Sequence, residues 1–510
     1  MQIQFSEKIY FRVKKKGSMT IFASLILVLI TSLLLTFLES ARVYGLKSYA
    51  NMTSLLTSES AFAEYSKELF ENYDLLFLDA AYGGEEFDLS KLQGTILQLN
   101  KDNLYEKKDF AFQKKTNLFH LEVKDITVSE YELATDYEGM IFYQQVVSAM
   151  KGKAPYMAIE TLKNEIEKTN DSSMNKKNPE EEMENAKNNI SSAREARQKK
   201  AEQEQKPVVI SQEEKNAENP LDFVMKLKTE GILSLVVDRS AELSNQELNA
   251  VEDIQNRTYT KGNMTNVFSP DLADKLWYQL YLNQYFGSYT IQKDNTALMY
   301  EREYIVCGKD SDKKNLEAVV NRLLMVREAA NYAYLLTDSV KTQEALGLAT
   351  ALVGFTANPL IIGAVQYGIL GAWAFVESVL DVRMLLSGNK VMPIKTAATW
   401  ITDILHISQS FESAKNTKSD TGLSYNQYLQ GMLSITKESV LSIRTMNLME
   451  KNIWKISGDH TLQMNHLIQS IDVSYTYQAS PLFSNILSIT KGKLDPYQFS
   501  IQKQYSYIKN

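Results

Sequence analysis

The chain has 510 residues, 44% of them hydrophobic, and a formal net charge of −7. This length allows more than one hydrophobic core, and the acidic balance argues against a nucleic-acid partner, which favours a basic domain. Because Cys307 is the one cysteine, an intramolecular disulfide and a zinc site built from cysteines are excluded. These features fit a cytosolic protein, or one that a bacterium exports without oxidative folding.

The first predicted element is a single-pass transmembrane helix over residues 19–38, a run of 20 residues without a charge. At about 1.5 Å per residue such a helix is roughly 30 Å long, which matches the hydrocarbon core of a bilayer. Basic residues precede it, whereas Glu39 follows it directly. The positive-inside rule therefore predicts residues 1–18 as a cytoplasmic leader and the rest of the chain outside the cell. A cleaved secretory signal is the alternative, but residues 38–41 are a poor match for the small residues that cleavage requires.

The basic leader ends in Gly17, and the apolar helix follows at once from Ser18. This layout is similar to the start of type IV prepilins and Tad-type minor pilins, which are processed after such a glycine. The resemblance makes Gly17 and Ser18 a candidate processing site. Processed pilins commonly have a glutamate at the fifth mature position, where this chain has Phe22. The other interpretation, a glycine at the interface end of an uncleaved helix, stays open.

Beyond the membrane, residues 39–79 are predicted to continue the helix as a stalk, because residues 39–72 contain no proline and a single glycine. Residues 80–167 are the expected first part of the ectodomain. Within it, residues 119–134 alternate apolar and polar side chains with a phase slip near Asp125. This pattern predicts one or two strands with a bulge or turn, and a helix is expected over residues 140–168.

Residues 168–220 consist almost entirely of Glu, Lys, Asn, Gln, Ser and Ala. So few large apolar side chains cannot bury a core, which predicts a disordered linker or a solvated helix at a domain boundary. The linker lacks the apolar a and d positions of a coiled coil, although coiled-coil pairing remains an expectation for the helical parts of the chain.

The main ectodomain, residues 221–510, is predicted to be helical and to end in strands. Helical stripes of apolar residues cover residues 313–340 and 423–451. Residues 345–376 are uncharged, and Pro359 divides them into two arms. They form either a hairpin in the membrane or two buried helices, and the short arms favour buried helices.

Residues 471–477 and 499–507 alternate like strands and could pair with residues 119–134 in one antiparallel sheet. The two ends of the ectodomain would then meet near the membrane. Together the patterns predict a mainly helical α+β fold with a small antiparallel sheet.

Motifs of known enzyme classes are missing: the sequence has no phosphate-binding loop, no dinucleotide fingerprint, no HExxH and no GxSxG. His460 and His466 could ligate a metal only in principle. Asp310 and Asp312 resemble the start of a calcium loop, but the glycine and glutamate that complete an EF-hand are absent. We therefore expect no catalytic residue, no cofactor and no metal.

Glu377 and Asp381 lie one helical turn apart, so their carboxylates share a face and could in principle act as a general acid and base. Compensation by buried basic groups is the favoured interpretation. The sequence predicts a buried polar network of four residues: Arg327, Glu377, Asp381 and Arg383. Lys390 is a further candidate partner.

Several segments together resemble an uncharacterised family of bacterial surface proteins, known only as a domain of unknown function. They include KGSMTIFASLILVLI in the anchor, YEREYIVCGKDSDKKNL (residues 300–316), LLMVREAANYAYLL (323–336) and WAFVESVLDVRMLLSGNKVMPIK (373–395). The resemblance implies an origin in Gram-positive clostridia, an association with Tad-type pilus loci and a TadE-like N-terminus. It supplies no established catalytic residue.

The expected function is a membrane-anchored structural or accessory component of a Tad-like pilus or secretion apparatus. Its expected partners are the membrane and proteins of that apparatus, with an unknown oligomeric state. The alternative is an extracellular domain that binds a ligand or a cell-wall polymer, although the 18-residue cytoplasmic leader leaves no room for a signalling domain. A surface hydrolase that uses Glu377 and Asp381 is a third hypothesis, and it requires both carboxylates in an open cleft.

Overall fold

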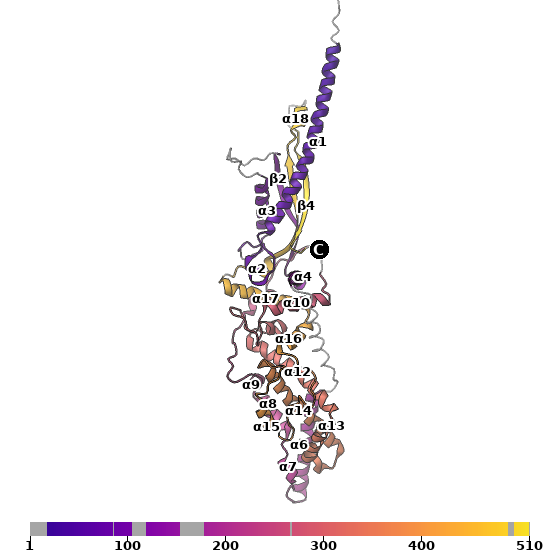
Figure 1. Cartoon of the computed structure of the whole chain (residues 1–510), viewed down its shortest axis with the longest axis vertical. Helices are drawn as coiled ribbons and strands as arrows, with labels where there is room; N and C mark the ends of the chain where they lie inside the picture. Colours follow the sequence, from indigo (N-terminus) through magenta and orange to yellow (C-terminus); the bar gives the residue numbers. More distant parts are fainter. Residues whose placement is uncertain are drawn as a thin grey trace, which may run out of the picture.

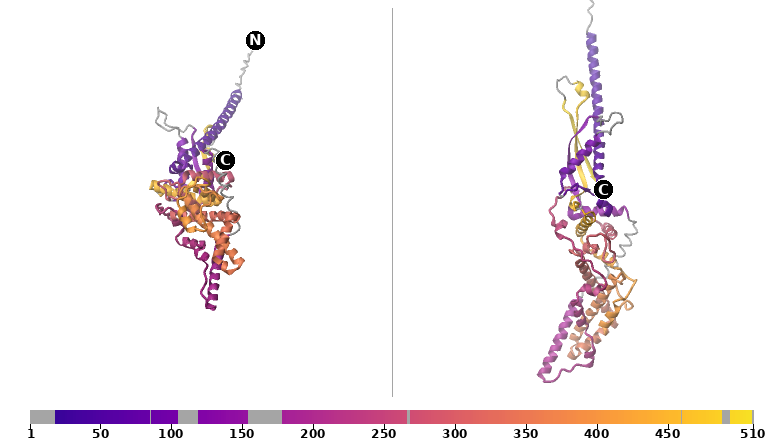
Figure 2. Two further views of the ribbon diagram at one scale, coloured as in Figure 1. Left: turned by 60° about the horizontal axis from the view of Figure 1, so that its bottom comes forward. Right: turned by 90° about the vertical axis from the view of Figure 1, so that its left-hand side faces the viewer.

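The computed structural model describes residues 18–84, 86–104, 119–153, 178–265, 268–458, 460–487 and 494–508. The fold is mainly helical with one small antiparallel sheet, as the sequence predicts. The molecule is elongated: helix α1 projects from one end, the sheet lies beside its second half, and a helical body extends to the other end (Figure 1). The two further views show the same order along the long axis (Figure 2).

Helix α1 (Ser18–Phe62) has two halves with different surroundings. The apolar residues 19–38 are largely exposed, whereas Leu46, Ala50 and Phe62 are buried against the sheet. The predicted stalk is therefore only partly correct. The helix ends at Phe62 rather than near residue 79, and α2 (Lys67–Tyr73) begins separately because Ser66 caps it by accepting a hydrogen bond from the Leu69 amide.

The sheet consists of β1 (Leu78–Asp79), β2 (Leu121–Leu133), β3 (Leu467–Ala479) and β4 (Tyr497–Ser506). All pairs are antiparallel, with β3 between β2 on one side and β1 and β4 on the other. This confirms that the C-terminal strands and residues 119–134 share one antiparallel sheet, in which β3 pairs directly with β2 and β4 pairs with β3. The register of β2 shifts between Val123 and Asp125, at the predicted bulge.

One face of the sheet is apolar and covered, and the other is polar and open. Ile471, Val473, Tyr475 and Tyr477 alternate along β3 and are buried, in a core that they share with α1 and α3 (Leu89–Leu104). The three residues between them, Asp472, Ser474 and Thr476, are polar and partly exposed. This alternation is the period-two pattern of a sheet that buries one face.

The helical body contains α4 (Asp136–Lys151), α10 (Leu272–Tyr285) and α17 (Glu438–Ser457) near the sheet, and α12 (Asp312–Thr337), α13 (Ser339–Val353) and α14 (Pro359–Leu386) farther away (Figure 1). The shorter helices are α7 (Gln212–Asn216), α8 (Pro220–Thr229), α9 (Ile232–Val236), α11 (Glu301–Cys307), α15 (Ile407–Ala414), α16 (Tyr425–Ser434) and α18 (Phe483–Leu487).

The single helix expected over residues 423–451 is instead the pair α16 and α17. The break falls at Ile435 and Thr436, two β-branched residues with weak helix propensity. The Thr436 hydroxyl donates a hydrogen bond to the Met432 carbonyl, one of the carbonyl groups in the last turn of α16.

In the described part of residues 168–220 the structure has a helix, one of the two predicted alternatives, but this helix packs on the body and is not solvated on all sides. Helix α6 (Pro179–Gln203) buries Met183, Ala186 and Ile190 against the helical body. It lies along α14, whose Gly368 has no room for a side chain because a Cβ there would meet Ala186 and lie 2.9 Å from the Glu182 carbonyl oxygen. Small residues at this contact allow the two helices to approach closely, so a stripe with few large apolar residues is sufficient for packing.

Two described helices are long and apolar enough to cross a membrane, one starting at Met19 and the other α14. The apolar window of the first is not buried, whereas more than half of that of α14 is. In residues 368–386 of α14, every side chain except Arg383 is buried. The end of the molecule that carries α13 also lies far from the apolar half of α1 (Figures 1 and 2). These features favour the buried-helix interpretation of residues 345–376.

Candidate functional site

A buried ion pair joins α12 to α14. The Arg327 Nε and Nη2 atoms donate hydrogen bonds to Asp381 Oδ2 at 3.0 and 2.9 Å, and both side chains are fully buried. The Asn331 amide donates to the same oxygen at 2.9 Å. The sequence predicted this contact, because buried charges require compensation.

Lys395 connects Asp381 to the second predicted carboxylate. Its ammonium group pairs with Glu377 Oε1 and lies 2.7 Å from Asp381 Oδ1. The other oxygen of Glu377 accepts hydrogen bonds from the Thr402 amide and hydroxyl. Burial alone would raise the pKa of Asp381, but Lys395 and Arg327 outweigh it, so the pKa of this carboxyl lies below its usual value.

This arrangement has no open cleft. Glu377 and Asp381 are 0% exposed and their charges are compensated by Lys395 and Arg327. The condition for a surface hydrolase at these two carboxylates is therefore not met. The network of Arg327, Asn331, Glu377, Asp381 and Lys395 fixes α12, α14 and the loop after α14 to one another.

Two details of the predicted network differ from the structure. Arg383 lies outside it and donates hydrogen bonds to the Lys415 and Leu235 carbonyls at 3.0 and 3.2 Å. Two residues along a helix turn the side chain by about 200°, so Arg383 cannot share a face with Asp381. Lys395 was missed because it lies in the loop after α14, where no periodicity indicates burial; the other candidate, Lys390, is exposed.

The residues that the sequence offered as candidate metal or calcium ligands have structural roles instead. His460 stacks on Trp454, and the described residues contain no group of three or more His, Cys, Asp and Glu that could hold a metal ion. The Asp312 carboxylate accepts hydrogen bonds from the Met299 and Tyr300 amides, both at 2.9 Å, and from the Ser244 hydroxyl. It therefore connects loops rather than forming a calcium site. Gly17 lies outside the described residues, and Ser18 is the first residue of α1.

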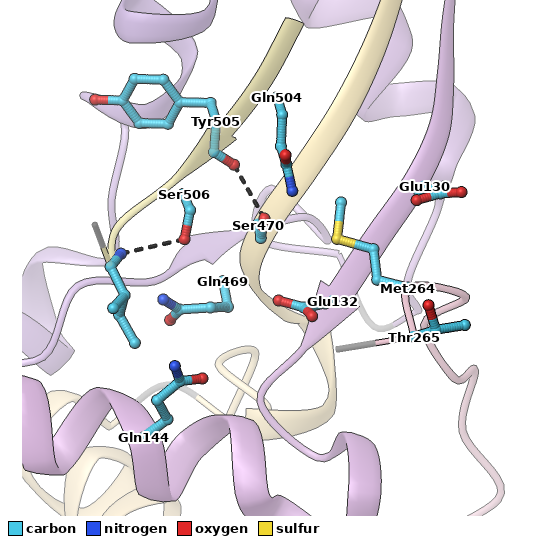
Figure 3. A pocket seen from close by; sticks show the side chains of 11 residues that line it. Glu130, Glu132, Gln144, Met264, Thr265, Gln469, Ser470, Gln504, Tyr505 and Ser506 are labelled. Atoms are coloured by element: carbon cyan, nitrogen blue, oxygen red, sulfur yellow. Dashed lines mark hydrogen bonds between the residues drawn. The ribbon is translucent and has the colours of Figure 1, made fainter. Parts of the chain in front are cut away.

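A polar pocket lies where the sheet meets the helical body, and no sequence pattern indicated it. Its volume is about 460 Å³. Figure 3 shows side chains from β2, β3, β4 and α4 around it. The lining residues are Glu130, Glu132, Gln144, Met264, Thr265, Gln469, Ser470, Gln504, Tyr505, Ser506 and Ile508. None of them is basic, so the pocket suits a neutral or cationic polar group.

Two buried side chains in this pocket lack hydrogen-bond partners within the described part of the chain. They are Gln469, 1% exposed, at both amide atoms, and Glu132, 6% exposed, at Oε1. Burial, with a smaller effect from the nearby Asp136 carboxylate, raises the pKa of Glu132 to about 7. Asp136 itself accepts hydrogen bonds from the Leu133 and Gly262 amides. Since buried polar groups normally have partners, these two mark the pocket as a candidate binding site.

Sequence reasoning could not find this pocket because its residues come from distant segments. The predicted pairing of residues 119–134 with residues 471–477 was the only relevant signal. It places the ends of β2 and β3 together, but not the cavity between them and α4.

Residues 210–479, more than half of the chain, match the model of a family described as a family of unknown function, DUF5702. No curated protein and no solved structure matches the chain.

Proposed function

The chain belongs to the family of unknown function DUF5702, and for this member we propose the role of a membrane-anchored extracellular protein that acts through contacts with other proteins. The observation that carries the proposal is the position of the apolar residues 19–38. They are exposed on a helix that projects from one end of the molecule (Figure 1). Exposed apolar surface of this extent requires a partner, and the length fits a bilayer.

The opposite end of the molecule offers a surface for protein contacts. It is formed by the end of α6, by α7 and by the connection between α13 and α14 (Figure 1). Val209 and Leu360 are 82% and 83% exposed there. Arg197 lies over the ring of Phe355, at 3.8 Å from its centroid, and forms a two-point ion pair with Glu214. These contacts stabilise the end that would present the exposed apolar side chains.

The finer proposal is an accessory component of a Tad-like pilus or secretion apparatus in a Gram-positive clostridium. It rests on the sequence resemblance and on the leader that ends in Gly17. Mass spectrometry of the membrane-extracted protein tests the pilin-like part. A mature N-terminus at Ser18 that depends on a prepilin peptidase is the expected result, and a retained Met1 would reduce the protein to a plain anchor.

A photo-crosslinking experiment tests the role in contacts. A benzophenone amino acid replaces Leu360 at the distal end, and the exposed Lys206 serves as a position with a polar side chain for comparison. The expected result is a crosslink from position 360 to a protein of the pilus or secretion apparatus in living cells. Assembly of that apparatus without this chain, together with no crosslink, would contradict the proposal.

A second candidate function is ligand binding in the polar pocket, favoured by the Gln469 amide and the Glu132 Oε1 atom, which lack hydrogen-bond partners within the described part of the chain. Soluble cell-wall glycan fragments, which are rich in hydroxyl and amide groups, are the appropriate probe. Calorimetric titration should show binding that Gln469→Leu removes and that Gln498→Leu, at an exposed position of β4 outside the pocket, preserves. Equal heats for the wild type and Gln469→Leu would exclude the pocket as the site for these fragments.

A further inference from the structure

The connection between β3 and β4 lies beside α1 at the level where its apolar half ends. It contains the short helix α18, which contacts α1 (Figure 1). The carboxylate of Glu39, the first residue after the apolar segment, accepts hydrogen bonds from the backbone amides of Leu482, Phe483 and Ser484. Glu39 is only 4% exposed, so its carboxylate binds the backbone of this loop and has little contact with solvent.

Arg42, one turn farther along α1, completes the attachment. Its Nη1 donates to Glu39 Oε1 and to the Ser480 carbonyl, both at 3.0 Å, and its Nη2 donates to the Phe119 carbonyl at 3.2 Å. The start of α18 and the end of β3 are therefore fixed to α1 at the height of Glu39. A carboxylate bonded to backbone amides and a guanidinium group forms strong, charge-assisted hydrogen bonds.

The loop held at this height exposes apolar side chains. Leu482 is 50% exposed, Ile486 69% and Leu494 43%. Leu38, the last residue of the apolar segment, is also half exposed and directly precedes Glu39. The exposed apolar surfaces of α1 and of the α18 segment therefore adjoin each other.

We propose that α18 is a second membrane contact, with Leu482 and Ile486 inserted into the outer leaflet at the level of the headgroups. This inference rests on the proposed membrane anchor. If residues 19–38 cross the bilayer, Glu39 lies at its outer boundary, and the hydrogen bonds to Glu39 place α18 there as well. A helix that lies at this interface buries its apolar side chains at the boundary between headgroups and acyl chains, and its binding increases with the apolar area that it buries. A second contact beside α1 also restricts rotation of the ectodomain about the helix axis and so fixes which face it turns to the membrane.

Fluorescence quenching in vesicles tests this contact on the full chain. The buried Cys307 is replaced by alanine, and single cysteines at Leu29, Ile486 or Lys206 carry an environment-sensitive dye. The vesicles contain phosphatidylcholine with a nitroxide either near the headgroup or deep in the acyl chain. We expect the label at position 486 to lose most of its emission to the headgroup-proximal nitroxide and less to the deep one, because it lies at the interface.

The two other labels separate failure of this inference from failure of the anchor. Position 29 should be quenched by the deep nitroxide, and position 206, at the far end of the molecule, by neither. Quenching at 29 without quenching at 486 overturns the second contact and leaves the anchor intact; α18 would then face water or a protein. Loss of quenching at both positions overturns both proposals.

Discussion

Lys395 is surrounded by the carboxylates of Glu377 and Asp381, and its removal leaves a buried negative charge without compensation. We expect Lys395→Met to lower the free energy of unfolding by about 3–5 kcal/mol, the usual cost of breaking a buried pair. Denaturant unfolding monitored by circular dichroism measures this change.

Two controls accompany Lys395→Met: the same substitution at an exposed lysine, and a double variant that also neutralises the partner carboxylate. Lys390→Met, at an exposed position nearby, should change stability little. The double variant Glu377→Gln, Lys395→Met should recover part of the loss, because it removes both charges. A single variant as stable as the wild type would show that this contact does not stabilise the fold.

Glu132 gives a prediction about pH. Because its pKa is raised to about 7 in the folded protein, the folded state binds more protons than the unfolded state between about pH 4.5 and 7, and stability falls as the pH rises through this range. Glu132→Gln cannot ionise and should be more stable than the wild type at pH 8 by on the order of 1 kcal/mol.

The difference between Glu132→Gln and the wild type should shrink at pH 5, where the glutamate is protonated. Glu130→Gln, at an exposed position of the same strand, is the matched control and should follow the wild type at both pH values. Thermal unfolding at the two pH values measures the effect. A constant difference between Glu132→Gln and the wild type would refute the raised pKa.

At the scale of residues, the sequence predicted contacts that obey helix periodicity. Glu377 and Asp381 share a face because they are four apart, and their need for cations followed from burial. Lys395 and Gln469 could not be predicted, since a loop lysine and a strand glutamine have no periodic signal that indicates what surrounds them.

Helix α6 illustrates packing at the scale of elements. Its contact with α14 depends on Gly368, where a Cβ would meet Ala186 and the Glu182 carbonyl. We expect Gly368→Ala to destabilise the protein by about 1–3 kcal/mol through overpacking, and to expose α6 to trypsin at Arg194 and Arg197. Limited proteolysis followed by mass spectrometry detects this exposure.

Gly363→Ala is the matched control for Gly368→Ala. Gly363 lies on the same helix, and a Cβ there would meet nothing within 4 Å. This variant should therefore stabilise α14 by up to about 1 kcal/mol, the helix propensity difference between glycine and alanine. Equal effects of the two alanines would show that α6 does not pack closely on α14.

The elements were predicted with uneven success for physical reasons. Strands with clear alternation and the Pro359 helix start were recovered, because local chemistry dictates them. The end of α1 at Phe62 was missed, since residues 63–72 could also continue a helix. The packing of α6 was missed because its buried stripe consists mostly of small or isolated apolar residues.

At the scale of the whole molecule, the long axis separates the apolar half of α1 from the end formed by α7 and the connection between α13 and α14 (Figure 1). This separation is compatible with a protein that is held by one end and makes contacts with the other. The order of segments along the axis could not be predicted, because it depends on the pairing of β2 with β3, which are more than 330 residues apart. The mainly helical α+β class, by contrast, followed from local patterns alone.

The central claim, an anchored protein with its large domain outside the cell, is tested most directly by cysteine accessibility in intact cells of the native host. On the Cys307→Ala background, in cells without prepilin peptidase so that the leader is retained, Ser6→Cys reports on the leader and Lys206→Cys on the far end of the ectodomain. A membrane-impermeant maleimide should label position 206 in intact cells and position 6 only after permeabilisation. Labelling of position 6 but not of position 206 in intact cells would contradict the proposed topology.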